Sequence, residues 1–171
     1  MHTIEALDLW KQFDKEEVLK GIDLCMEQGE ILGILGPSGA GKTTLVKCLI
    51  GILGLNKGRV TINGAKIPSL HLMDRIGYMA QQDALYEDLT GLQNLVFYGR
   101  LKGMDKKQAA RQANTLMDMV ELGKDKGKKA VHYSGGMKRR LSLAAALIGD
   151  PEVIVLDEPT VGIDPVLREL F

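Results

Sequence analysis

Residues 31–44 read "ILGILGPSGAGKTT", an apolar run that ends in glycines and is followed by a lysine and two threonines. The run "ILGIL" at 31–35 is short, apolar and stopped by turn residues, which predicts a buried strand. After the loop, "KTTLVKCLIGIL" has its apolar residues at helical spacing, so a helix should follow. A strand, a glycine-rich loop and a helix in this order predict an α/β fold.

The glycine-rich loop indicates a phosphate-binding site. Its glycines let backbone N–H groups close around phosphate oxygens, while Lys42 reaches the β- and γ-phosphates and the Thr43 hydroxyl can ligate Mg²⁺. A chance turn before a helix does not explain the Gly-Lys-Thr end. The candidate phosphate-binding residues before the lysine are Gly36, Pro37, Ser38, Gly39, Ala40 and Gly41.

The stretch "VIVLDEP" at 153–159 predicts a second buried strand that ends on two carboxylates. Asp157 is placed to hold Mg²⁺, and Glu158 to polarise a water for attack on the γ-phosphate. A lone Asp-Glu pair is more often a solvated strand end. Because this pair follows a strand in a chain with a phosphate-binding loop, we interpret it as catalytic.

A second anion-binding device occurs at residues 132–140, "HYSGGMKRR". A Ser-Gly-Gly turn ahead of a helix offers unpaired backbone N–H groups and the positive end of the helix dipole. Ser134 also fits a plain helix N-cap.

The remaining segments predict a small antiparallel β lobe and a helical region. "TIEALDLW", "VLKGIDLCMEQG" and "GRVTING" alternate like strands, and "RIGYMA" at 75–80 is another strand. Thr90 and Gln93 are spaced as a capping box. The next stretch places Ala109, Ala113, Leu116 and Val120 on one helix face, with Met117 and Met119 filling gaps near this core.

Composition narrows the class of protein. With 171 residues, 45% hydrophobic and 26% charged, the chain is typical of an ordinary globular domain. Basic and acidic residues both number 22, so the chain has no overall positive electrostatic field that would attract nucleic acid. Cys25 and Cys48 lack metal or redox spacing and are expected to be small buried hydrophobes. We expect "GKDKGKK" at 123–129 to be a solvated loop, and neither a signal peptide nor a membrane span is expected.

Five ordered motifs now carry a family resemblance: "GPSGAGKTT", "QQ" at 81–82, "YSGGM", "VIVLDEP" and "GID" at 162–164. Together they resemble the nucleotide-binding domain of an ATP-binding cassette (ABC) transporter. "SGGM" followed by basic residues is similar to the subgroup that exports drugs, lipids or polysaccharides. The resemblance implies an α/β P-loop NTPase with a RecA-like core, a small antiparallel β lobe and a helical signature subdomain.

The resemblance implies a role for the second anion-binding device. Domains of this family pair head to tail, so that the phosphate loop of one copy and the signature loop of the other enclose one ATP. Ser134, Gly135 and Gly136 would then bind the γ-phosphate held by Lys42 of the partner subunit.

Other positions match the family one at a time. Thr44 completes the phosphate-loop motif. Phe13 matches the aromatic that stacks on adenine, although a core residue at a strand edge would look the same. Gln81, with Gln82 as the alternative, matches the glutamine that senses Mg²⁺ and the attacking water. Asp164 matches a loop that communicates between paired copies, although Asp before Pro is also an ordinary turn.

Two departures from the family pattern stand out. Tyr133 replaces a usual leucine in the signature, which is tolerable. The family's switch histidine follows "GID" by a long interval, and none of the three histidines here fits its position. In the family, this histidine lies on a strand in the middle of the sheet, beside the phosphate-loop strand, and without that strand the backbone of its neighbours would be unpaired. We therefore interpret the chain as truncated at the C-terminus. The truncated chain is expected to bind nucleotide weakly and to show negligible turnover.

The resulting expectation is an ATP- and Mg²⁺-dependent subunit on the cytoplasmic face of the membrane, paired with a second copy and with transmembrane permease subunits, and binding no nucleic acid. Residues 1–82 and 150–171 should form the β lobe and core, and residues 83–149 the helical subdomain. The alternatives are a soluble ATPase of the same family and a non-catalytic nucleotide-binding or regulatory module.

Overall fold

The computed structural model describes residues 2–159, which divide into two compact units between Met73 and Asp74. Each unit is described by itself. The predicted division into 1–82 with 150–171 and 83–149 stays a prediction.

The first unit contains a four-stranded antiparallel sheet of order β2-β1-β3-β4. Its strands are β1 (Ile4–Phe13), β2 (Glu16–Met26), β3 (Lys57–Ile62) and β4 (Ala65–Lys66). Ala6, Val60 and Ile62 are buried at alternate positions, as expected for a sheet with one covered face. The predicted antiparallel lobe is confirmed.

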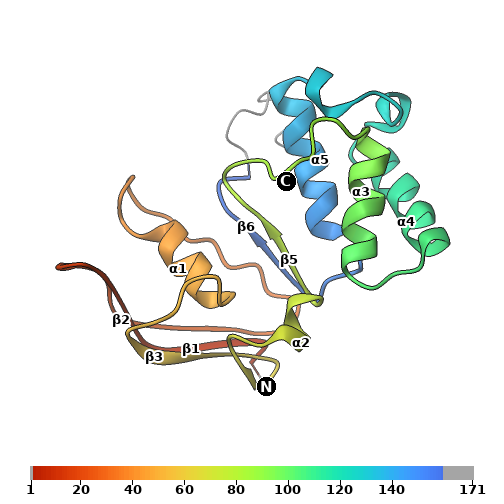
Figure 1. Ribbon diagram of the computed structural model, residues 1–171. Helices are drawn as coiled ribbons and strands as arrows, with labels where there is room; N and C mark the ends of the chain where they lie inside the picture. Colours follow the sequence, from red (N-terminus) through yellow and green to blue (C-terminus); the bar gives the residue numbers. More distant parts are fainter. Residues whose placement is uncertain (1, 160–171) are drawn as a thin grey trace. The chain divides into compact units, whose positions relative to one another are not determined.

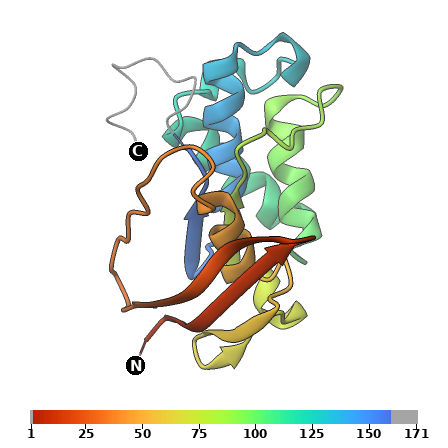
Figure 2. The same cartoon turned by 90° about the vertical axis from the view of Figure 1, so that its left-hand side faces the viewer.

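Two helices complete the first unit, α1 (Lys42–Leu49) and the one-turn α2 (Leu70–Met73). Figure 2 shows α1 over the sheet. Helix α1 buries Leu45, Val46, Cys48 and Leu49. Of the two cysteines expected to be buried, only Cys48 is; Cys25 lies exposed in β2, and both are free thiols.

The strand predicted at residues 31–35 is wrong. Residues 27–41 form no strand or helix and run as a long open loop between β2 and α1 (Figure 2). Ile31 and Leu35 are 97% and 95% exposed. An apolar run becomes a strand only where neighbours supply partners for its N–H and C=O groups, and no strand in the described part of the chain pairs with these residues.

The second unit holds a parallel strand pair and three α-helices among its described residues, as can be followed in Figure 1. Strand β5 (Ile76–Met79) pairs with β6 (Val153–Leu156) in the register Ile76 to Val153 through Met79 to Leu156. The helices are α3 (Gly91–Leu101), α4 (Lys106–Met119) and α5 (Gly135–Leu147), with 3₁₀ turns η1 (Gly123–Asp125) and η2 (Ala130–His132). Both strands match the predicted ones.

Helix α5 is central to the second unit, because it packs against β5 and against the other two helices. At one point β5 and α5 touch through backbone: a Cβ on Gly77 would lie 2.2 Å from the carbonyl oxygen of Ala146. No side chain larger than hydrogen fits between them. Gly77 therefore sets the distance at which the strand that leads to Gln81 approaches α5.

The helical core confirms most of the sequence pattern. The predicted α4 face is buried, Met117 is fully buried among Leu95 and Leu141, and the Thr90–Gln93 capping box begins α3. Met119 departs from prediction, since its side chain is 59% exposed. It lies on the opposite face of α4 from Met117, because two residues advance a helix by about 200°.

Candidate nucleotide site

The phosphate-binding loop has the backbone conformation that its glycines permit. Gly39 and Gly41 adopt φ angles of 81° and 86°, which side chains with a Cβ rarely take. Gly41 also lies against β2, where a Cβ would be 2.9 Å from Cγ1 of Val18. Helix α1 begins at Lys42, directly after this turn. Its unpaired N–H groups and positive dipole end therefore face the loop, as a phosphate site requires.

Lys42 is folded back over its own loop. Its Nζ donates to the carbonyl oxygens of Gly36 and Pro37, each at 2.8 Å. Neutral carbonyls are weaker partners for an ammonium than phosphate oxygens. An anion bound in the loop would therefore compete for this charge on favourable terms. Thr43 and Thr44 follow in the first turn of α1.

The carboxyl ends of β5 and β6 bring together three predicted site residues. Asp157 is buried, with 5% exposure, and its N–H donates to the Met79 carbonyl at 2.9 Å. Gln81 Nε2 donates to Glu158 Oε2 at 3.0 Å, so it is Gln81 and not Gln82 that contacts the catalytic candidate. Parallel strands end at one edge of a sheet, which explains this meeting of residues far apart in the chain.

Glu158 has an unusual backbone. Its φ angle is +52°, in the left-handed region that costs a residue with a side chain roughly 1–2 kcal/mol. Such a conformation persists only where neighbouring contacts hold it. The chain turns sharply at Glu158, directly after β6, and the Glu158 side chain accepts a hydrogen bond from Gln81.

Asp157 lies beside Tyr78 of β5. Burial first, and then the negative charge of the Asp157 carboxylate, raise the pKa of the Tyr78 hydroxyl. The phenol is thus even less acidic than an ordinary tyrosine, and it lies next to the carboxylate predicted to bind Mg²⁺. A buried carboxylate at a strand end, with a glutamine and a second carboxylate nearby, is an oxygen-rich donor set that suits Mg²⁺.

The Ser-Gly-Gly turn begins α5 as predicted. Ser134 is the N-cap, and its Oγ accepts from the Met137 N–H at 3.3 Å. Ser134 and Gly135 are exposed, and a Cβ on either glycine of the turn would meet nothing within 4 Å. The start of this helix is therefore sterically open to a ligand.

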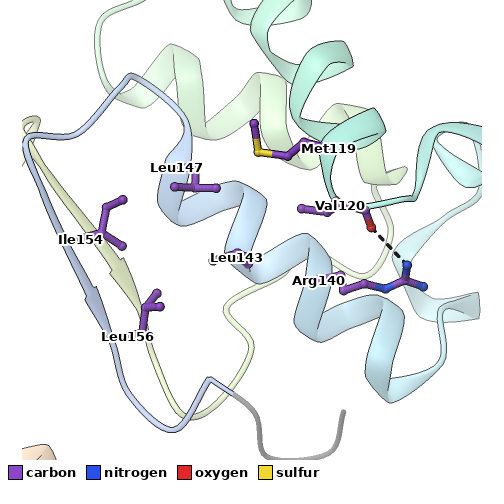
Figure 3. A pocket seen from close by; sticks show the side chains of 7 residues that line it. All are labelled: Met119, Val120, Arg140, Leu143, Leu147, Ile154 and Leu156. Atoms are coloured by element: carbon purple, nitrogen blue, oxygen red, sulfur yellow. Dashed lines mark hydrogen bonds between the residues drawn. The ribbon is translucent and has the colours of Figure 1, made fainter. Parts of the chain in front are cut away.

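The basic residues after this turn do not form an anion site. Lys138 pairs with Glu87 at 2.6 Å, and Arg139 is buried with its guanidinium on backbone carbonyls. Arg140 donates to the Val120 carbonyl at 3.2 Å (Figure 3). Sequence reasoning missed Arg139 as a site residue; the available signal was its helical spacing from Ser142 and Ala146, which share its buried face.

Tyr133, the departure from the family signature, is buried in the helical core. Its hydroxyl donates to the Asp125 carbonyl at 2.8 Å, which ties the basic loop at 123–129 to the start of α5. Most of that loop is exposed, as predicted. The larger side chain is accommodated because residue 91 is a glycine, where a Cβ would lie only 2.2 Å from the tyrosine oxygen.

Phe13 ends β1 with 43% of its surface exposed, so the alternative of a core residue is wrong. Lys11 Nζ lies 4.9 Å from the ring centroid. An exposed ring beside a cation is available for stacking on a base. Asp164 lies outside the described residues.

One apolar pocket of about 290 Å³ lies in the second unit, and none of the predicted site residues lines it. Figure 3 shows its lining from α4, α5 and β6: Met119, Val120, Arg140, Leu143, Leu147, Ile154 and Leu156. Its aliphatic walls offer no donors for phosphate beyond Arg140, whose guanidinium is turned to a carbonyl.

These features define a P-loop nucleotide-binding domain with a separate signature turn. The sequence matches the family described as "ABC transporter" over residues 19–161. The chain belongs to the ABC transporter family, and its fold is that of an ABC ATPase domain. The resemblance drawn from the five motifs is confirmed at the family level.

Individual relatives agree with this assignment. Nod factor export ATP-binding protein I of Burkholderia lata is 40% identical over 170 residues, covering 98% of this chain and 56% of the relative. Daunorubicin resistance ATP-binding protein DrrA3 of Streptomyces coeruleorubidus is 44% identical over 158 residues, covering 91% and 50%. The chain thus spans about half the length of the curated relatives it matches.

Among solved structures, a dimeric post-hydrolysis state of the ATP-binding cassette MJ0796 bound to ADP and Pi superposes with a TM-score of 0.89. It is 27% identical in sequence, with 98% of this chain and 78% of that chain covered. Among the described residues, no helix combines the length and hydrophobicity needed to cross a bilayer.

Proposed function

We propose that this protein binds ATP with Mg²⁺ and hydrolyses it as the motor subunit of a membrane exporter. The observation that carries the proposal is the hydrogen bond from Gln81 to Glu158 at 3.0 Å. It joins a carboxylate able to act as a base to an amide able to orient water, at the ends of two parallel strands.

Each residue has a defined task in this proposal. The glycine loop and Lys42 bind the phosphates, and the ring of Phe13 stacks on adenine. Thr43, Asp157 and Gln81 are the residues that would hold Mg²⁺, and the bound ion would supply charge stabilisation on the transferred phosphoryl group. Glu158 accepts a proton from the attacking water, and Gln81 positions that carboxylate through their hydrogen bond.

The open start of α5 supports a head-to-tail pair of copies. Ser134, Gly135 and Gly136 present a helix N-terminus that is sterically free, and this chain already has a phosphate loop of its own. We infer that the turn binds the γ-phosphate held by the partner's Lys42, with Asp164 in the loop between copies. The likeness to a dimeric cassette bound to ADP and Pi supports this arrangement.

The transport role is inferred from relatives named for Nod factor export and for daunorubicin resistance. We infer that closing and opening of the pair drives separate permease subunits, with this protein on the cytoplasmic face of the membrane. No nucleic-acid partner is proposed, since the formal net charge is +0.

The proposal is tested with Glu158→Gln in the full-length subunit. The variant should keep ATP affinity, lose steady-state phosphate release by about 10²- to 10⁴-fold, and accumulate an ATP-bound dimer on size exclusion. Glu17→Gln makes the same chemical change on an exposed position of β2 and should leave turnover unchanged. Wild-type turnover in Glu158→Gln, or no phosphate release from the unmodified subunit, contradicts the proposal.

A further inference from the structure

Arg139 is the buried charge at the centre of the second unit. It lies in the second turn of α5 with 4% of its surface exposed. Its neighbours Lys138 and Arg140 point to other partners, because successive residues on a helix are about 100° apart. A charged side chain this deeply buried is costly unless all its donors are paired.

Every N–H group of this guanidinium has a carbonyl oxygen to donate to. Nη1 donates to Ala80 at 2.7 Å and to Gln81 at 3.1 Å. Nη2 donates to Asp157 at 2.8 Å and to Glu158 at 2.5 Å. Nε donates to Pro159 at 3.3 Å. Five bonds use the five donors that an arginine carries.

These carbonyls belong to two segments only, the residues directly after β5 and those directly after β6. One planar group therefore joins the backbone around Gln81 to the backbone around Glu158, the two residues whose side chains meet at 3.0 Å. The bond to the Glu158 carbonyl also holds the residue with the left-handed φ of +52°.

The charge of Arg139 is balanced locally. Asp83 Oδ1 lies 3.5 Å from Nη1, and Ser142 Oγ donates to the same oxygen at 2.6 Å. Asp83 follows Gln81 by two residues, and Ser142 follows Arg139 by three on α5. Asp83 therefore supplies a negative charge beside the same nitrogen that donates to Ala80 and Gln81, and Ser142 orients that carboxylate.

We propose that Arg139 is a positioning residue for ATP hydrolysis, holding Gln81 and Glu158 at their working separation through their backbones. It contacts none of the reacting atoms itself. The inference rests on the proposed function. Lysine cannot substitute, because its three donors sit on one nitrogen, whereas the arginine fork reaches two segments at once.

The test compares Arg139→Lys with Arg140→Lys in the full-length subunit. Arg139→Lys keeps the charge but loses the fork, and a displacement of the catalytic pair by about 1 Å can cost about 10²-fold in rate. We expect kcat to fall about tenfold to a hundredfold, with the KM for ATP and the calorimetric ATP affinity within about threefold. Arg140→Lys alters contacts with the Val120 carbonyl and the Glu121 carboxylate, on another face of α5, and should change kcat less than threefold.

Hydrogen exchange provides a readout that does not depend on turnover. In Arg139→Lys the amide of Asp157, which donates to the Met79 carbonyl at 2.9 Å, should exchange about tenfold faster, while those of α3 and α4 stay unchanged. Arg139→Met, which removes the charge and all five bonds, should lose more activity than Arg139→Lys. If the methionine variant does not fold, the lysine variant and its exchange pattern decide alone.

The inference is overturned if Arg139→Lys keeps its kcat within threefold and its exchange pattern unchanged. It is also overturned if ATP affinity falls as far as kcat, since that indicates a binding or general folding role. If the unmodified subunit releases no phosphate, the proposed function fails. Faster exchange at the Asp157 amide then still supports the positioning of the two segments by Arg139, while unchanged exchange overturns it.

Discussion

The phosphate loop and the carboxylate pair are equally clear in sequence but differ in how the structure holds them. Residues 27–41 carry few backbone bonds, such as Ala40 N–H to Pro37 at 3.3 Å, and most of the loop is exposed. The residues after β5 and β6 are joined by strand pairing and by the five bonds of Arg139. A motif therefore specifies chemistry, whereas rigidity depends on partners elsewhere in the chain.

Breaking the well-held region should have the largest effect. Gly77→Ala places a Cβ 2.2 Å from the Ala146 carbonyl oxygen, so β5 and α5 must separate. We expect unfolding of the second unit to become easier by about 3 kcal/mol, at the upper end for overpacking in a core. Urea unfolding followed by far-UV circular dichroism measures the change.

The control for this change is Gly127→Ala, where a Cβ meets nothing within 4 Å. It should leave stability within about 0.5 kcal/mol. Equal stability of Gly77→Ala and the control would show that β5 and α5 are not in backbone contact.

The phosphate loop is tested through Lys42→Ala. Removing the ammonium deletes its charge-assisted interaction with the β- and γ-phosphates, worth about 1.5–3 kcal/mol in all. ATP affinity measured by calorimetry should fall about tenfold to a hundredfold, with little change in stability because the Lys42 ammonium bonds carbonyls of its own exposed loop. Lys47→Ala, in the last turn of the same helix, should bind ATP normally. Equal ATP affinity of both variants would contradict the assignment of Lys42 to phosphate binding.

The sequence predicted the parts of this molecule that local chemistry determines. The alternation of apolar and polar residues predicted β1, β2 and β3, and the capping box predicted the start of α3. Gln81 and Glu158, both assigned to hydrolysis from their motifs, lie within hydrogen-bonding distance. The exposed run at 31–35 could not be predicted, since burial of a strand depends on neighbours that its own residues do not encode. Arg139 was missed because a basic residue after a glycine turn has the pattern of an anion site, and only the fold shows that it binds carbonyls.

Tyr133→Phe probes a smaller part of the well-held region. It removes the hydroxyl that donates to the Asp125 carbonyl at 2.8 Å but keeps the ring in the core. Losing one such bond costs about 1 kcal/mol. Urea unfolding should show this loss, while Tyr86→Phe, at a ring that is 49% exposed, should be close to neutral. A neutral Tyr133→Phe would indicate that the hydroxyl plays no part in tying the 123–129 loop to α5.

The smallest effect is expected at Ile31, in the open loop between β2 and α1. The side chain is 97% exposed, so Ile31→Thr removes no buried surface and should change stability by less than about 0.5 kcal/mol. Ile62→Thr makes the same substitution at a β3 position that is 1% exposed, and should cost about 2 kcal/mol through a lost methyl and a buried hydroxyl.

Both variants are measured by urea unfolding of the 171-residue chain followed by Trp10, the only tryptophan, which lies in β1 of the same unit. A loss in Ile31→Thr as large as that in Ile62→Thr would mean that residues 31–35 are packed in a sheet, as their apolar pattern predicts. The phosphate loop would then be held as firmly as the carboxylate pair. A neutral Ile31→Thr supports the contrast between the open phosphate loop and the firmly held carboxylate pair. Apolar residues contribute to stability only where a neighbouring strand or helix covers them.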